Sequence, residues 1–82
     1  MTTITIYTTS YCPYCVRAKQ LLDNKQVAYQ EIDVSDRSLR SKMTELTGGT
    51  TVPQIVINGQ ATGGCDELYA LERAGELDKL LS

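Results

Sequence analysis

Apolar and polar positions alternate at the start of the chain, which is typical of a short β-strand. Ile4 and Ile6 alternate with threonine residues as far as Tyr7. From Pro13 to about Lys25 the apolar residues follow helical spacing instead, and residues 27–34 alternate once more. The apolar face of the helix contains four residues: Cys15, Ala18, Leu21 and Leu22. A strand, a helix and a strand in about 30 residues predict a βαβ unit with parallel strands and a right-handed crossover.

A second helix is expected after this unit. Ser35 or Asp36 can cap its first N–H groups, and the pair Gly48-Gly49 ends it. Its apolar stripe consists of three residues at helical spacing: Leu39, Met43 and Leu46. We expect this stripe to pack on the sheet.

The last third of the chain predicts an antiparallel hairpin and a third helix. Residues 54–57 form a strand, and Asn58-Gly59 is the strongest short hairpin signal, so the chain returns through residues 60–62. After Gly63-Gly64, a helix is expected from near Asp66 to Ala74. Three leucines then close the chain: Leu77, Leu80 and Leu81. The order of elements, βαβ followed by αββα, predicts an α/β fold whose sheet has both parallel and antiparallel strands.

Length and composition restrict the class of protein. The 82 residues are enough for one small domain, so we expect a single domain over residues 1–82. Residues 1–5 contain no basic segment, and no long apolar run follows, so neither a signal peptide nor a membrane span is expected. The net charge of −2 without a basic cluster argues against a nucleic-acid partner. Three cysteines, two of them in Cys-x-x-Cys, favour catalytic use in a reducing cytoplasm.

The segment Cys12-Pro13-Tyr14-Cys15 is the most informative chemical feature of the chain. A helix that begins at Pro13 makes Cys12 its N-cap and places Cys15 one turn inside, on the same face. Cα atoms with this spacing lie about 5 Å apart, within the range that a disulfide tolerates. The segment therefore predicts a thiol–disulfide exchange centre.

The two cysteines are expected to have different roles. Free N–H groups and the helix dipole favour the thiolate form of Cys12, which makes it the expected nucleophile. Cys15 should be less exposed, keep a higher pKa and act as the resolving thiol. A zinc site is the structural alternative, but three cysteines and no histidine supply neither four thiolates nor a mixed set of two cysteines and two histidines. No metal ligand is therefore assigned.

The chain resembles a dithiol glutaredoxin over its whole length. The resemblance depends on three motifs: Cys12-Pro13-Tyr14-Cys15, Thr51-Val52-Pro53 and Gly63-Gly64-Cys65-Asp66. It implies a thioredoxin fold, with a four-stranded mixed sheet flanked by three helices. It also implies an enzyme that uses Cys12 and Cys15 to reduce protein disulfides and glutathione mixed disulfides. Glutathione is then reductant and co-substrate, and no cofactor is tightly bound.

The resemblance also implies where glutathione binds. Thr51-Val52-Pro53 corresponds to a cis-proline loop whose Val52 backbone pairs with the cysteinyl part of glutathione. The N–H groups of Cys65 and Asp66, after the close-approach residue Gly64, receive the γ-glutamyl carboxylate. Asp66 would both cap the helix and receive the ligand's ammonium group, and the Tyr14 ring would border the groove.

The residues of this site also have structural explanations. Without the active-site motif, Pro53 is interpreted as a trans proline that starts a strand, and Gly63-Gly64 as a turn before an ordinary Asp66 cap. Tyr14 is equally consistent with a surface aromatic residue. For Cys65, a small apolar filler with a useful backbone N–H is the favoured role, and no catalysis is assigned to it.

Two positions depart from the family pattern. Thr9 stands where many glutaredoxins have a lysine, and Gly49 lies where relatives often have an arginine before the Thr-Val-Pro loop. Both cations ordinarily meet the glycyl carboxylate of glutathione or support the thiolate. Arg40 on the second helix is either a substitute charge or a solvated surface residue.

Two other functions remain as alternatives. One is an electron donor that thioredoxin reductase feeds and that serves ribonucleotide reductase. The other is an iron–sulfur cluster binding module, a dimer in which Cys12 and glutathione hold the cluster. The anion site at Gly63-Gly64-Cys65-Asp66 favours glutathione over the first, and Pro13-Tyr14 argues against the second. The expected partners are glutathione and oxidised or glutathionylated proteins, ribonucleotide reductase among the candidates, and the protein is expected to be a monomer without a membrane partner.

Overall fold

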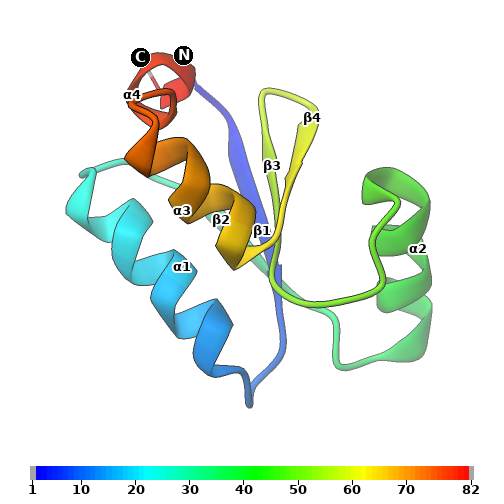
Figure 1. The fold of residues 1–82 in the computed structure, drawn as a ribbon. Coiled ribbons are helices and arrows are strands. Elements are labelled where there is room, and N and C mark those ends of the chain that lie inside the picture. The colour runs from blue at the N-terminus through cyan, green and yellow to red at the C-terminus, as the bar shows by residue number, and fades with distance from the viewer. Residues whose placement is uncertain (1, 82) are drawn as a thin grey trace.

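Four strands form one mixed sheet in the order β2-β1-β3-β4 (Figure 1). The computed structural model describes residues 2–81. The strands are β1 (Ile4–Thr8), β2 (Gln30–Asp33), β3 (Gln54–Ile57) and β4 (Gln60–Gly63). Strand β1 pairs with β2 in parallel, with Ile6 opposite Glu31, and with β3 in antiparallel register, with Ile6 opposite Ile55. The predicted parallel first half and antiparallel second half are both confirmed.

Helices cover both faces of this sheet. They are α1 (Pro13–Asn24), α2 (Arg37–Thr47), α3 (Cys65–Arg73) and the short α4 (Leu77–Leu81). Helices α1 and α3 lie on one face and α2 lies on the other (Figure 1). The architecture is a thioredoxin-like α/β fold, as predicted. In addition to the three expected helices, the C-terminal leucines form the short helix α4. No helix in the described part of the chain is long and apolar enough to cross a membrane.

The alternation along β1 divides the core between the two faces. Ile4 and Ile6 are buried with Leu22 of α1 and Leu68 of α3 in the larger cluster. Tyr7 points the other way and packs in a smaller cluster with Val34 and Met43 of α2. Because successive strand residues face opposite sides, a single strand supplies both clusters. The end of β1 leads directly to the start of α1, so the core fixes the position of Cys12 and Cys15.

Local signals explain most of the element boundaries. Asp36, rather than Ser35, caps α2, because its Oδ1 accepts a hydrogen bond from the Ser38 N–H at 2.8 Å. Gly48 ends the helix with φ of 77°, in the left-handed region that glycine enters without a Cβ penalty. Asn58 and Gly59 both have positive φ, 52° and 83°, as the predicted hairpin turn between β3 and β4 requires.

One strand boundary and one helix face differ from the sequence prediction. Strand β2 begins at Gln30, because β1 offers it a hydrogen-bonded partner only from Thr5 onward. Residues 27–29 therefore precede the strand. In α2 the predicted apolar stripe is buried only at Met43, whereas Leu39 and Leu46 are 39% and 69% exposed. The prediction that all three leucine and methionine positions pack on the sheet was wrong for the two outer residues.

Candidate active site

Cys12 lies at the N-cap of α1, where the chain turns from the end of β1 into the helix. Its backbone is extended, with φ of −151°, and Pro13 follows as the first helical residue. The Cys15 N–H donates a hydrogen bond to Cys12 Sγ at 3.2 Å. The sulfur of Cys12 therefore takes the place that a serine or aspartate oxygen occupies at an ordinary N-cap. A hydrogen bond from a backbone N–H stabilises a thiolate more than a thiol.

Cys15 is the buried member of the pair. It is 2% exposed on the α1 face that meets the sheet. Burial, and next the hydrogen bond with Cys12, raise the pKa of the Cys15 thiol from 9.0 to about 12. Cys15 is therefore protonated at neutral pH. The prediction that Cys15 is the less exposed of the two thiols is confirmed.

The Thr51-Val52-Pro53 loop lies beside the first thiol. The Val52–Pro53 peptide bond is cis, as predicted, and the alternative of a trans proline starting a strand is wrong. Cys12 Sγ lies 3.7 Å from the Val52 carbonyl oxygen, to which its thiol donates. The main chain at Val52 is thus the nearest polar group that could hold an extended ligand against the Cys12 sulfur.

Buried Gln54 holds this loop in place, a role that the sequence did not suggest. Its side-chain amide donates to the Thr51 carbonyl oxygen at 3.0 Å and to Thr51 Oγ1 at 3.3 Å. Gln54 is 6% exposed and is the first residue of β3. A glutamine in an otherwise apolar strand was the available signal, because a buried amide needs polar partners.

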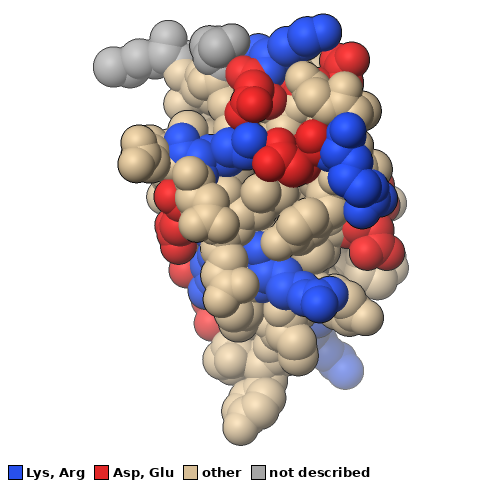
Figure 2. Space-filling view, turned by 60° about the vertical axis from the view of Figure 1, so that its left-hand side comes forward, with Lys and Arg blue, Asp and Glu red and all other residues tan. Residues whose placement is uncertain are grey.

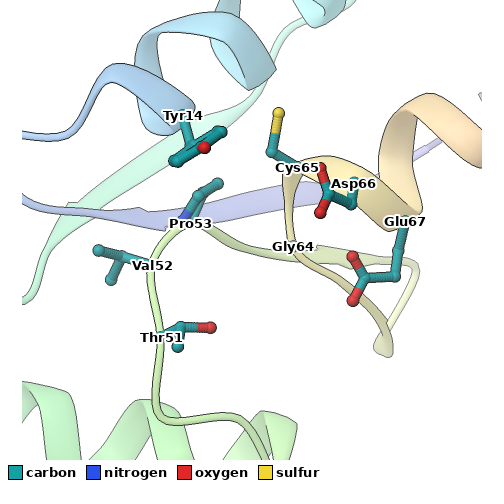
Figure 3. Close-up of a pocket in the computed structure, with 8 residues that line it drawn as sticks. All are labelled: Tyr14, Thr51, Val52, Pro53, Gly64, Cys65, Asp66 and Glu67. Atoms are coloured by element: carbon teal, nitrogen blue, oxygen red, sulfur yellow. The ribbon is translucent and has the colours of Figure 1, made fainter.

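One cavity of about 310 Å³ adjoins the loop and the start of α3 (Figure 3). Its lining contains the seven residues predicted for glutathione together with Glu67: Tyr14, Thr51, Val52, Pro53, Gly64, Cys65, Asp66 and Glu67. The Tyr14 ring lies next to the Pro53 ring, and the Asp66 and Glu67 carboxylates project from α3 on the opposite side (Figure 3). Residues from α1, the cis-proline loop and α3 thus meet at one cavity.

The start of α3 approaches the loop closely. Gly64 is the N-cap of α3, and a Cβ at this position would lie 3.2 Å from the Pro53 carbonyl oxygen. The helix begins at Cys65, so the Cys65 and Asp66 N–H groups belong to its free first turn. The prediction that Asp66 caps the helix was wrong, because Asp66 lies inside the helix. The N-cap residue is Gly64, and no side-chain hydrogen bond caps this end of α3. The Asp66 carboxylate is exposed at the cavity instead.

The positions that depart from the family pattern have a structural explanation in one case. A Cβ at Gly49 would lie 2.7 Å from Gln54 Cδ, so a larger residue would displace the amide that holds Thr51. Arg40 donates to the Thr50 carbonyl oxygen at 3.1 Å and lines a different cavity from Thr51 and Val52. Arg40 therefore contacts the loop at Thr50 and does not line the cavity that contains Thr51 and Val52. Thr9 is half-buried.

Cys65 contributes a third thiol at the same place. It is 6% exposed, and burial followed by the charge of Asp66 raises the pKa of its thiol. Its sulfur lies at the cavity between Tyr14 and α3 (Figure 3). Within residues 2–81, no group of three or more histidine, cysteine, aspartate or glutamate side chains is arranged to hold a metal ion.

A thiol at a helix N-cap and a buried thiol one turn inside the helix, beside a cis-proline loop, define a thiol–disulfide oxidoreductase of thioredoxin-like fold. Comparison with known proteins gives the family. The glutaredoxin family model matches residues 4–61, more than half of the chain. The chain belongs to the glutaredoxin family.

Relatives match over nearly the full length. The chain is 55% identical over 83 residues to a glutaredoxin of Pseudomonas aeruginosa, covering 100% of this chain and 99% of the relative. It is 50% identical to glutaredoxin 3 of Escherichia coli, covering 99% of both chains. The crystal structure of a buckwheat glutaredoxin–glutathione complex matches with a TM-score of 0.87 and 33% identity, covering 95% of this chain and 74% of that one.

Proposed function

We propose that this glutaredoxin uses glutathione to reduce glutathione mixed disulfides and protein disulfides through Cys12 and Cys15. The observation that carries the proposal is the 3.7 Å distance between Cys12 Sγ and the carbonyl oxygen of Val52, because Val52 lines the cavity together with the other predicted ligand residues. A tripeptide with one thiol and charged ends fits a site that offers free main-chain groups, helix N–H groups and a carboxylate.

Each part of glutathione has a proposed partner. The Val52 backbone pairs with the cysteinyl residue and aims its sulfur at Cys12. The Cys65 and Asp66 N–H groups receive the γ-glutamyl carboxylate, and the Asp66 side chain receives the ammonium group. The Tyr14 ring and Thr51 border the groove. The solved buckwheat relative, which is a glutaredoxin–glutathione complex, supports this choice of ligand.

Reduction of a mixed disulfide needs Cys12 alone. The Cys12 thiolate attacks the glutathione sulfur of the mixed disulfide, the S–S bond breaks, and the protein substrate leaves as a thiolate that takes up a proton. Glutathione is then joined to Cys12. A second glutathione thiolate attacks the bound glutathione sulfur, which forms glutathione disulfide and returns the Cys12 thiolate. The net reaction is a thiol–disulfide exchange, in which one glutathione thiol is consumed, the substrate thiol is released and the mixed disulfide becomes glutathione disulfide.

Reduction of a protein disulfide needs both cysteines. Cys12 attacks one sulfur of the substrate and forms a mixed disulfide, releasing the first substrate thiolate. Cys15 then loses its proton, attacks Cys12 Sγ and displaces the second substrate thiolate. The resulting Cys12–Cys15 disulfide is reduced by two glutathione molecules, which leave as glutathione disulfide.

The remaining assignments follow from this activity. The protein works as a monomeric, single glutaredoxin domain over residues 1–82, with glutathionylated or oxidised proteins as partners and ribonucleotide reductase among the disulfides to test. Because glutathione must be available to reduce the enzyme again, the proposed compartment is the reducing cytoplasm.

A coupled assay tests the function. A small glutathione mixed disulfide is supplied with glutathione, glutathione reductase and NADPH, and NADPH consumption is followed for the wild type and Cys12→Ser. We expect turnover by the wild type and none above background by the variant, whose urea midpoint must match that of the wild type so that misfolding does not explain the loss.

Absence of turnover by the wild type would overturn the proposal. NADPH consumption when thioredoxin reductase replaces glutathione would then favour the electron-donor function. Visible absorbance of anaerobically purified protein would favour the iron–sulfur cluster module.

A further inference from the structure

A second cavity lies next to the one proposed for glutathione. It has a volume of about 370 Å³ and five lining residues: Arg17, Cys65, Asp66, Tyr69 and Arg73. Arg17 comes from α1 and Tyr69 and Arg73 come from α3, so the cavity is a groove between the two helices on the same face of the sheet (Figure 1). We call it the α1–α3 groove. Cys65 and Asp66 line both cavities, so the two adjoin.

The α1–α3 groove carries two cations that the fold does not use. Arg17 and Arg73 are both exposed, and within residues 2–81 neither has an ion pair or a side-chain hydrogen bond. In contrast, Lys19 and Lys25 bind carboxylates at 3.0 Å and 2.7 Å. Figure 2 brings the α1 side of Figure 1 forward and shows basic side chains on this face. Asp66 is the carboxylate of the groove, so its lining has two positive charges and one negative charge.

The helices hold the groove in a defined shape. The Tyr69 hydroxyl of α3 donates to the Arg17 carbonyl oxygen of α1 at 3.2 Å. Arg17 lies two residues after Cys15, and its charge lowers the pKa of the Cys65 thiol against the larger effect of burial. The charge of Cys12 also acts on Cys65. Arg17 is therefore electrostatically close to Cys65, a thiol that also interacts with Cys12.

We propose that the α1–α3 groove binds an acidic side chain of the protein half of a glutathione mixed disulfide. The proposal rests on the glutathione function, because glutathione fills the first cavity and leaves the neighbouring groove for the segment that carries the substrate cysteine. Arginine is suited to this partner, since its guanidinium binds a carboxylate through two parallel hydrogen bonds. The ammonium group of bound glutathione would neutralise Asp66, which leaves the groove with a net positive charge.

Paired substrates test the proposal. One peptide has glutamates on both sides of a glutathionylated cysteine, and its twin has glutamines. The value of kcat/KM is measured for both peptides with the wild type, the double variant Arg17→Gln/Arg73→Gln and the control Lys42→Gln. Lys42 is exposed on α2, on the opposite face of the sheet, and loses one charge without touching the groove.

We expect the wild type to prefer the acidic peptide by roughly fivefold to tenfold, as two exposed ion pairs would give. The double variant should lose this preference, the control should keep it, and added salt should reduce it in the wild type. Equal kcat/KM for the two peptides with the wild type would overturn the proposal, and so would an equal loss for both peptides in the double variant. The wild-type ratio and its salt dependence decide the matter even if the double variant does not fold.

Failure of the docking proposal is distinguishable from failure of the function. Turnover of a small mixed disulfide without any preference for the acidic peptide would overturn the docking site and leave the glutathione function standing. Failure to reduce the small mixed disulfide would overturn the function itself.

Discussion

Cys15 lies one turn inside α1 and is 2% exposed, whereas Cys12 is half-buried at the start of the helix. A hydrogen bond links the two residues, because the backbone N–H of Cys15 donates to Cys12 Sγ. Burial raises the pKa of Cys15 to about 12. At neutral pH its thiol is therefore protonated and a poor nucleophile. The difference lies in the environment of two chemically identical side chains.

This asymmetry predicts that the two cysteines fail differently when replaced. In Cys15→Ser, reduction of a small glutathione mixed disulfide should persist within about threefold of the wild-type rate, since Cys12 is the one protein thiol that reacts in that route. Reduction of a protein disulfide should fall by at least roughly a hundredfold, because no thiol remains to displace the product. The two rates are measured in the coupled assay with matched concentrations of enzyme. A Cys15→Ser variant that is inactive toward the mixed disulfide would contradict the single-cysteine route.

The resemblance to the glutaredoxin family, carried by three motifs, predicted much of the candidate site. The positions of Tyr14, Val52 and Asp66 at one cavity follow from motifs far apart in the sequence. Gln54 and Glu67 were not predicted, because neither belongs to a motif and each is recognised only by what lies beside it. The Asp66 cap was predicted wrongly for a related reason: a shift of one or two residues in the helix start moves a carboxylate from the cap into the first turn.

At the scale of elements, Lys25 connects three helices. It follows the end of α1, and its Nζ lies 2.7 Å from Glu72 Oε1 of α3 and 2.8 Å from Asp78 Oδ1 of α4. Its side chain is 19% exposed. The hydrogen bonds with Asp78 and Glu72 raise the pKa of Lys25 above its ordinary value. One cation therefore fastens the short C-terminal helix to the rest of the fold.

Removing this cation should loosen α4. Lys25→Met keeps the length of the side chain and leaves two carboxylates close to each other without a cation. We expect a lower urea midpoint than in the wild type, and added salt should reduce the difference because it screens the repulsion. Lys42→Met, at an exposed position on α2, is the matched control and should leave the midpoint unchanged. Equal midpoints for Lys25→Met and the wild type at low salt would show that the network does not stabilise the fold.

The periodicity of the sequence predicted which helices and strands form better than it predicted which of their residues are buried or paired. Helix α2 has its apolar stripe where expected, yet only Met43 reaches the core and Leu46 remains 69% exposed. A stripe gives the direction of a helix face, but the extent of the sheet beneath it comes from the register of other strands. For the same reason the start of β2 at Gln30 was not predictable from alternation, which continues through residues 27–29 where β1 offers no partner.

At the scale of the whole molecule, folding lowers the pKa values of some carboxylates and raises those of some thiols and lysines, so the stability of the fold depends on pH. Hydrogen bonds lower the pKa values of three carboxylates. The main donor is Thr8 for Glu31, Ser35 for Asp33 and Ser38 for Asp36. Their contribution to stability is present above the unfolded pKa values near 4 and is lost as the pH falls through the lower folded values. Stability should therefore decline in acid.

The alkaline side follows from groups whose pKa values are raised. Burial raises those of Cys15 and Cys65, and contacts with carboxylates raise those of Lys19 and Lys25. A raised folded pKa means that the folded protein holds its proton more tightly than the unfolded chain does. The corresponding stability is complete below the unfolded pKa, 9.0 for a cysteine and 10.5 for a lysine, and is lost as the pH rises toward the folded value.

The reduced protein should therefore be most stable between these limits and lose stability above about pH 9, with Cys15 the largest single cause because its pKa reaches about 12. Urea unfolding of the reduced protein at pH 7, 9 and 10 measures the decline. Cys15→Ala removes one titrating thiol while the lysines and Cys65 remain, so the variant should be less stable at pH 7 but should lose less stability between pH 9 and 10. Parallel declines for the variant and the wild type would mean that Cys15 titrates in the folded protein as it does in the unfolded chain. That result would contradict the buried, protonated resolving thiol on which the division of labour between the two cysteines depends.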